Sequence, residues 1–360
     1  MNHIWRDRCA GSRNTRPTPR VRGVTHRDVV VVGASAGGVE ALRTLVAGLP
    51  GDLPAAVLIV LHVPRSAPSA LAAILARVSS LPVRPAVDGE MLRHGRVYVA
   101  VVDRHLLVLD NRIRLSRGPS ENGHRPAIDP LFRSAARSFG PRVVGVVLSG
   151  TRDDGAAGLA VVSQLGGITV VQDPADAAYP AMPRAAMNAC EVDHVLPVTK
   201  IGPLLGEVVR QPAPPFVPGQ DALLNTEVDV ASTVPDGESD LGSPATYGCP
   251  ACGGALYEIS GVPSPRYRCR VGHAWSPESL LEEQSAALES SLWMALRALS
   301  EKSALSRQMA AAFEDRLGGR HTVGRFETMA RDADEAAEMI KGLIEQIGAT
   351  ADGSPVQSSE

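Results

Sequence analysis

The sequence predicts an α/β fold: a doubly wound, mostly parallel sheet over residues 28–200, then a small zinc-ribbon-like segment and a C-terminal helical hairpin. Three observations support this prediction. Short apolar runs rich in β-branched residues are typical of strands that are buried on both faces. Stretches with helical spacing of apolar residues separate these runs. The links are short, which favours a parallel sheet covered by helices on both sides.

The expected elements follow this alternation along the chain. Strands are expected at residues 29–32, 55–61, 96–101, 143–148 and 168–171. Helices are expected at residues 39–49, 70–78, 130–139 and 156–164. Residues 106–109 and 113–115, joined by a polar turn, have the pattern of a small hairpin. A sheet of this kind places its sites at the carboxyl ends of its strands.

Three flanking segments differ in composition from the predicted sheet. Residues 1–27 are rich in arginine and lack apolar periodicity, so we expect a disordered extension. Residues 211–246 are rich in Pro, Ser, Asp and Gly, which predicts a flexible linker. Residues 276–347 have the pattern of two helices broken at Gly318 and Gly319. A hairpin that packs on itself is favoured over a partner-binding coiled coil, although a signalling partner for this tail stays open.

Composition narrows the class of protein further. The formal net charge is −3, so no overall field favours nucleic acid. No apolar run reaches the length of a membrane-spanning helix, and the N-terminus lacks the apolar core of a signal peptide. The cysteine count is five, and an odd number argues against a disulfide framework. We therefore expect a cytoplasmic protein that inserts into no membrane.

Ser35 is a candidate nucleophile. Residues 33–37 read Gly-Ala-Ser-Ala-Gly directly after an apolar run, which fits the G-x-S-x-G turn between a strand and a helix. Such a turn exposes the serine hydroxyl at the edge of a sheet, above a helix N-terminus that stabilises negative charge. The alternatives are an anion-binding turn and a plain tight turn. Position 35 is not the glycine of a dinucleotide-binding fingerprint, and no Walker lysine follows.

A base and an acid are expected at the same edge of the sheet. His62 ends the apolar run 55–61, and Asp153 and Asp154 follow the strand 143–148 through a short loop. Together with Ser35 they provide the three groups of a catalytic triad. A histidine at a strand end is more often structural, and either aspartate could simply cap the next helix. The shared edge favours the joint interpretation.

The motifs resemble those of the CheB-type protein-glutamate methylesterases of bacterial chemotaxis, over residues 28–200. The likeness rests on Gly-Ala-Ser-Ala-Gly-Gly at 33–38, Leu-His-Val-Pro at 61–64, Asp-Arg-His-Leu at 103–106, His-Arg-Pro-Ala-Ile-Asp-Pro-Leu-Phe at 124–132, Ser-Gly-Thr-Arg-Asp-Asp-Gly-Ala-Ala-Gly at 149–158 and Met-Pro-Arg-Ala-Ala at 182–186. The resemblance implies that Ser35 is the nucleophile, His62 the base and Asp154 the acid, with no catalytic cofactor.

The resemblance also implies a substrate and a form of the enzyme. The substrate would be γ-methyl glutamyl esters on chemoreceptor-like proteins, with methanol released, and deamidation of receptor glutamines is the second activity that the resemblance implies. Thr151 stands where the family commonly has methionine. The short segment before residue 28 leads us to expect a stand-alone form without a receiver domain. A catalytically weak signalling adaptor with the same fold is the main alternative, and a nucleotide-binding module is a weaker one.

Four residues of the segment 247–275 have the spacing of a metal site. Cys249 and Cys252 form a Cys-x₂-Cys pair, and Cys269 and His273 form a Cys-x₃-His pair. Four such ligands suit a closed, structural Zn²⁺ site, and the alternative is a set of free buried thiols. Because the segment has little apolar core, a stabilising metal is favoured. Because we expect a flexible linker before it, we also expect metal removal to leave the candidate active site intact.

Overall fold

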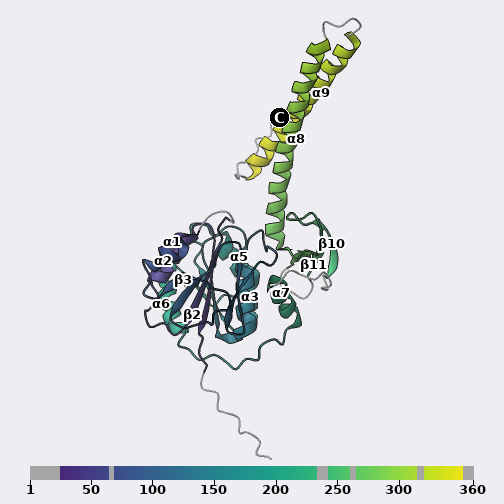
Figure 1. Cartoon of the computed structure of the whole chain (residues 1–360). Coiled ribbons are helices and arrows are strands. Elements are labelled where there is room, and N and C mark those ends of the chain that lie inside the picture. Colours follow the sequence, from purple (N-terminus) through teal and green to yellow (C-terminus); the bar gives the residue numbers. More distant parts are fainter. Residues whose placement is uncertain (1–24, 65–68, 233–241, 260–264, 314–319, 352–360) are drawn as a thin grey trace, which may run out of the picture.

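The computed structural model describes residues 25–64, 69–232, 242–259, 265–313 and 320–351. The expected extension 1–27 therefore lies almost wholly outside the described residues, as do Gly318 and Gly319. The described chain forms a body with a central sheet and a long helical arm (Figure 1). No helix in the described ranges is long and apolar enough to cross a membrane.

The central sheet has seven strands in the order β3-β4-β2-β1-β7-β8-β9, and all of its neighbours are parallel. Its strands are β1 (Val29–Ala34), β2 (Ala56–Leu61), β3 (Val83–Pro85), β4 (Arg96–Val99), β7 (Val143–Val147), β8 (Ile168–Gln172) and β9 (His194–Leu196). The chain moves from β1 to one side through β2 and later returns to the other side through β7. The strand order thus reverses at β1, where open α/β sheets form their sites.

Helices cover both faces of the sheet, as predicted. One face is covered by α1 (Gly38–Ala47), α2 (Leu71–Ala76) and α6 (Val198–Val208), and the other by α3 (Ile128–Phe139), α4 (Ala156–Gln164) and α5 (Ala181–Ala189). Alternate residues of β1 enter the two cores, because successive side chains of a strand point to opposite faces. Val30 and Val32 pack on the first face, whereas Val29 and Val31 pack on the second.

A separate hairpin packs beside α3. It consists of β5 (His105–Leu109) and β6 (Arg112–Ser116), and it agrees with the pattern at 106–115. The edge strands β3 and β9 were not predicted, because each has three residues and carries no clear alternation.

The expected linker 211–246 is not a simple flexible connection. It contains α7 (Ala222–Ser232), whose Leu224 and Val228 are buried and which packs on α3 and the β5–β6 hairpin. Two apolar residues four positions apart lie on the same side of a helix and can pack together against a neighbour. The segment therefore forms a packed helix although its average composition is polar. Residues 233–241 of this expected linker lie outside the described residues.

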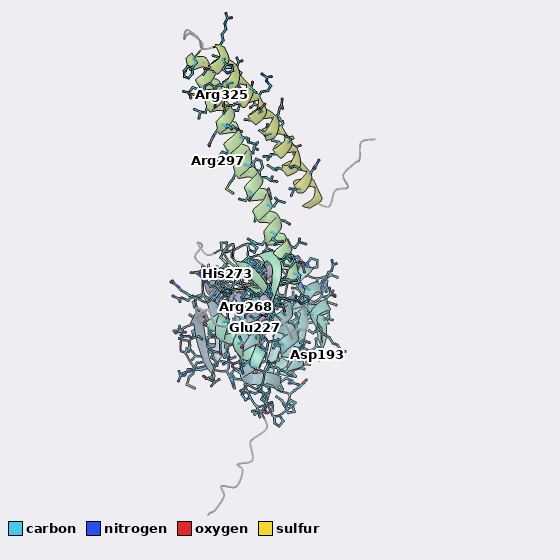
Figure 2. The ribbon with its side chains drawn as sticks, turned by 90° about the vertical axis from the view of Figure 1, so that its right-hand side faces the viewer. Asp193, Glu227, Arg268, His273, Arg297 and Arg325 are labelled. Carbon is cyan, nitrogen blue, oxygen red and sulfur yellow. The ribbon has the colours of Figure 1, made fainter. Side chains whose placement is uncertain are left out.

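The C-terminal part begins with a small antiparallel sheet. It comprises β10 (Ser243–Gly248), β11 (Ala255–Glu258), β12 (Tyr267–Cys269) and β13 (Ala274–Trp275). The long helices α8 (Pro277–Phe313) and α9 (Arg320–Ala351) follow and pack against each other. Figure 2 shows Arg297 and Arg325 on this arm, well away from Glu227, Arg268 and His273 in the body.

The contact between α8 and α9 contains small buried residues at spacings of three and four positions. Small buried residues of both helices lie at this contact, namely Ser303, Ser306 and Ala310 of α8 and Ala330, Ala333 and Ala337 of α9. Small side chains at 3–4 spacing let two helices approach closely along a narrow seam. Phe313 stacks on Phe326 towards the far end of the arm. The helical hairpin is therefore packed on itself, as predicted.

Candidate active site

Three neighbouring strands place Ser35, His62 and Asp154 at one edge of the sheet. Ser35 directly follows β1, and His62 directly follows β2. Asp154 lies in the loop between β7 and α4. Because β1 pairs with both β2 and β7, the three strand ends are adjacent.

The three side chains form a continuous hydrogen-bonded chain. The His62 Nδ1 atom lies 3.0 Å from the Ser35 hydroxyl oxygen, and the His62 Nε2 atom lies 2.8 Å from a carboxylate oxygen of Asp154. The His62 side chain is 6 % exposed and that of Asp154 is 1 % exposed. With its proton on Nε2, the imidazole donates to Asp154 and can accept the serine proton at Nδ1.

The Asp154 carboxylate is held by donors on both oxygens. One oxygen accepts the Ile128 N–H at 2.6 Å, and the other accepts the Asn122 side-chain amide at 3.1 Å. Burial alone would raise the pKa of Asp154, but the hydrogen bond and charge of His62 and the Ile128 N–H hold it well below its usual range. Asp154 is therefore an ionised group that can orient and stabilise a protonated His62.

A second histidine fixes the plane of the His62 ring. The rings of His62 and His124 are stacked, with centroids 3.6 Å apart and planes within 10°. His124 belongs to the His-Arg-Pro motif, but neither this stacking nor the contact of Asn122 was predicted. Both residues lie in a loop far from Ser35 in the sequence. They do not follow the end of a predicted strand, so the argument that predicted the three candidate triad residues did not apply to them.

The loop after β7 lies directly against the candidate nucleophile. A Cβ atom at Gly150 would lie 2.9 Å from the Ser35 Cβ and would collide with Met182 of α5. Only glycine therefore fits at this close approach. Thr151, the departure from the family pattern, is exposed at the following position.

The four predicted metal ligands also lie together. The ligand atoms of Cys249, Cys252, Cys269 and His273 all lie within 4.8 Å of one another. The Cys252 and Cys269 sulfurs are 3.6 Å apart, and the Cys249 sulfur is 3.8 Å from the His273 Nδ1 atom. Two sulfurs bound tetrahedrally to one Zn²⁺ lie about 3.8 Å apart, given a bond length of about 2.3 Å. The donor set and its spacing therefore fit a closed metal site.

Comparison with known proteins identifies the sheet domain. A family model described as CheB methylesterase matches residues 30–205. Residues 30–205 belong to the CheB methylesterase family. The CheB domain is 45% identical over 183 residues to protein-glutamate methylesterase/protein-glutamine glutaminase 2 of Anaeromyxobacter dehalogenans, which covers 51% of this chain and 54% of the relative.

Two further proteins resemble the CheB domain. Protein-glutamate methylesterase/protein-glutamine glutaminase 2 of Methanosarcina mazei is 36% identical over 192 residues, covering 51% of this chain and 52% of the relative. The crystal structure of the Thermotoga maritima CheB methylesterase catalytic domain is 32% identical, with a TM-score of 0.49, and covers 51% of this chain and 98% of that one. The chain thus spans about half the length of the curated relatives that it matches.

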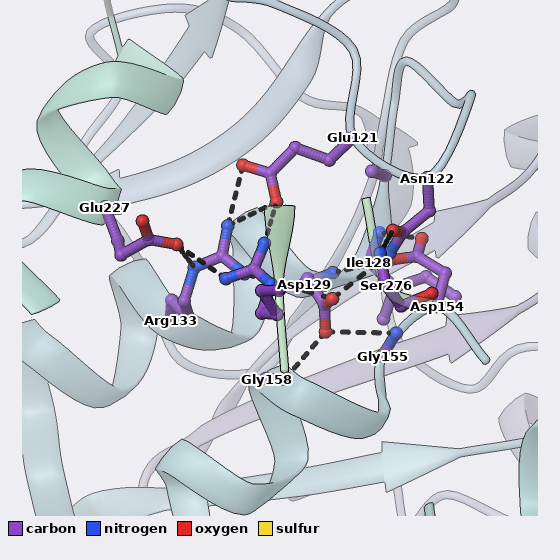
Figure 3. Close-up of polar contacts among 12 residues, drawn as sticks. Glu121, Asn122, Ile128, Asp129, Arg133, Asp154, Gly155, Gly158, Glu227 and Ser276 are labelled. Atoms are coloured by element: carbon purple, nitrogen blue, oxygen red, sulfur yellow. Dashed lines mark hydrogen bonds and ion pairs between the residues drawn. The ribbon is translucent and has the colours of Figure 1, made fainter. Parts of the chain in front are cut away.

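The C-terminal module, defined here as residues 243–283, packs on the CheB domain through buried charges. Glu121 of the CheB domain forms ion pairs with Arg133 at 2.5 Å and with Arg266 of the module at 3.0 Å. Glu227 of α7 pairs with Arg266 and Arg268, each at 2.5 Å. Figure 3 shows the carboxylates of Glu121 and Glu227 directed at the guanidinium group of Arg133.

This cluster corrects the expectation that a linker keeps the two parts independent. All five of its side chains are at most 6 % exposed. Burial alone would raise the pKa of Glu227, but the three arginines hold it well below its usual range. The cluster was not predicted because its members come from four separate parts of the sequence. Charged residues are usually exposed, so their presence in a sequence does not indicate that they are buried.

Proposed function

We propose that the protein is a serine hydrolase that cleaves γ-methyl glutamyl esters on chemoreceptor-like proteins and also deamidates receptor glutamines. The Ser35–His62–Asp154 chain at the carboxyl edge of a CheB domain is the observation that supports this proposal. Relatives of the CheB domain are named protein-glutamate methylesterase/protein-glutamine glutaminase. The methylated receptor is then the partner, the reaction needs no cofactor, and we assign the protein to the cytoplasm.

In the proposed first step, Ser35 attacks the ester carbonyl carbon. Its hydroxyl proton passes to the Nδ1 atom of His62, 3.0 Å away, and the carbonyl electrons move to the oxygen. Asp154 accepts the Nε2–H of His62 and stabilises the imidazolium that forms. The N–H groups that lead into α1 after Ser35 are suited to hold the oxyanion, because they lie at a helix N-terminus.

Collapse of the tetrahedral intermediate then releases methanol. His62 returns the proton to the departing methoxy oxygen, which leaves an acyl group on Ser35. Water attacks this acyl group, again with His62 as the base, and free glutamate and the serine hydroxyl are formed. With a glutamine substrate the same steps release ammonia in place of methanol.

The test of this proposal is methanol release from a methylated chemoreceptor, compared between the wild type and Ser35→Ala. An adaptor that only retains the fold would release no methanol in either form. The continuous triad gives no support to that alternative, because all three groups are within hydrogen-bonding distance.

Replacing Asp154 by asparagine is expected to lower kcat by about 10² to 10⁴, but by less than loss of Ser35. The amide cannot stabilise the imidazolium. Its single NH₂ group would face the Ile128 N–H in one orientation and the Asn122 amide in the other, so one donor loses its acceptor in either case. Steady-state kinetics with the methylated receptor measures this effect. A kcat close to that of the wild type would show that Asp154 is not the orienting acid.

We also propose that Cys249, Cys252, Cys269 and His273 bind one structural Zn²⁺ ion. Metal analysis of protein purified under reducing conditions is expected to give one zinc per chain. Chelation is expected to unfold residues 247–275, because few buried apolar side chains besides the ligands stabilise this segment. Protein without zinc whose β11 and β12 amides remain protected from exchange would contradict this proposal.

A further inference from the structure

Asn122 connects the candidate acid to the C-terminal module. Its side-chain NH₂ donates to Asp154 at 3.1 Å, and its side-chain oxygen accepts the N–H of Ser276 at 3.0 Å. Its own N–H donates to the carbonyl oxygen of Ala274 at 2.8 Å. Figure 3 shows Asn122 and Ser276 beside Asp154. One residue that is 1 % exposed thus joins Asp154 to the start of α8.

The residue next to Asp154 is held by the same helix. One carboxylate oxygen of Asp153 accepts the hydroxyl of Ser276 at 2.8 Å and that of Ser279 at 2.7 Å. Ser279 is fully buried, so this contact lies inside the interface. The loop that carries Asp154 is therefore attached to the first turn of α8.

Arg152, which precedes Asp153, forms further contacts with α8. Arg152 forms ion pairs with Glu282 at 2.6 Å and with Glu283 at 3.2 Å. Arg152 and Asn122 both have left-handed backbone conformations, with φ of 63° and 50°. This conformation is uncommon in residues other than glycine, although asparagine adopts it more readily than most, and the surroundings of both residues stabilise it. In both loops those surroundings include the C-terminal module.

We propose that the first turns of α8 are part of the apparatus that positions Asp154, so that catalysis depends on the docked C-terminal module. Asn122, Ser276 and Ser279 are positioning residues, because they act through hydrogen bonds to Asp154 and Asp153 and not through bonds to the reacting groups. This inference rests on the proposed function. It replaces the expectation from the sequence that the active site is independent of the C-terminal part.

The charge of Asp153 explains why losing its bonds to Ser276 and Ser279 would displace Asp154. Without the two serine hydroxyls, the Asp153 carboxylate loses two buried donors directly beside the ionised Asp154. An unpaired carboxylate gains free energy by turning towards water, and we expect the half-buried Asp153 to shift the adjoining Asp154 when it does so. A displacement of about 1 Å in a catalytic group is enough to cost about 10²-fold in rate.

The test uses the full chain with Ser276→Ala and Ser279→Ala combined. We expect kcat to fall about tenfold to a hundredfold, with KM changed less than about twofold, because the acid is displaced and the substrate surface is retained. The matched control combines Ser285→Ala and Ser291→Ala on the same helix. Those hydroxyls donate to carbonyl oxygens of α8 itself, so wild-type kcat is expected. Ser276→Thr keeps a hydroxyl for Asp153 and is expected to retain wild-type kcat.

A spectroscopic measurement separates positioning from simple destabilisation. The proton between His62 Nε2 and Asp154 is expected to give a far-downfield NMR signal, which weakens in the double variant and persists in the control. The circular dichroism spectrum is expected to stay that of the wild type. If the double variant does not fold, Ser279→Ala alone is expected to lower kcat about threefold to tenfold.

Two results would overturn the inference: wild-type kcat in the folded variant, or an unchanged downfield signal. Failure of the proposed function is a different outcome, since the wild type itself would then release no methanol. The downfield signal still tests the positioning of Asp154 in that case.

Discussion

Ser35→Ala and His62→Ala are each expected to lower kcat for ester hydrolysis by at least about 10³. The first variant lacks the attacking oxygen, and the second lacks the base that lies 3.0 Å from it. Because the two groups act in one step, the double variant is expected to be little worse than either single variant. Methanol release from methylated receptor under saturating conditions measures all three.

His94→Ala is a matched control for this series. His94 also lies near a strand, but its side chain is 56 % exposed and far from the triad in the fold. Wild-type kcat is expected for this variant.

Losses that multiply in the Ser35 and His62 double variant would show that the two residues act in separate steps, which contradicts the triad assignment.

Glu227→Gln is expected to reduce the stability of the docked C-terminal module by about 3–5 kcal/mol. Arg133, Arg266 and Arg268 would then face one remaining glutamate in a region shielded from water. Removing one partner of a buried ionic cluster leaves charge that neither solvent nor protein neutralises. Hydrogen exchange of the β11 and β12 amides measures the free energy of opening.

Asp229→Asn provides the control on the same helix. Asp229 pairs with Arg137, but its side chain is 70 % exposed. Exposed ion pairs contribute about 0–1 kcal/mol, so a small change in exchange is expected. An equal effect of the two substitutions would show that burial of the cluster does not determine its contribution.

The sheet and the meeting of the three candidate triad residues at one edge could be predicted because both follow from local patterns. Val29–Val32 is a continuous β-branched run, and such runs form strands that are buried on both faces. Ser35 and His62 follow directly after runs of this type, so the parallel topology alone brings them to one edge. The candidate metal ligands could be predicted for a similar reason, since the two members of each pair are only three or four positions apart in the sequence.

The contacts between the two parts of the chain could not be predicted in this way. Arg266 pairs with Glu121 across 145 positions of sequence, and no periodicity links the two. The side-chain amide of Asn122 donates to Asp154 in the loop after β7 and to Asp129 of α3, and its oxygen accepts the N–H of Ser276 just before α8. Polar residues in loops are most often solvated, so only the assembled structure shows that this one is buried.

The helix α8 is long enough to hold the end of the helical arm well away from the candidate active site. The helix begins beside the loop of Asp154 and has 37 residues, which corresponds to about 55 Å. Its far half leaves the body as an arm (Figure 1). A macromolecule that binds the arm near Phe313 and Phe326 is expected to leave the edge near Ser35 accessible. Under the proposed function, tethering at one end would raise the effective concentration of any substrate held near the other.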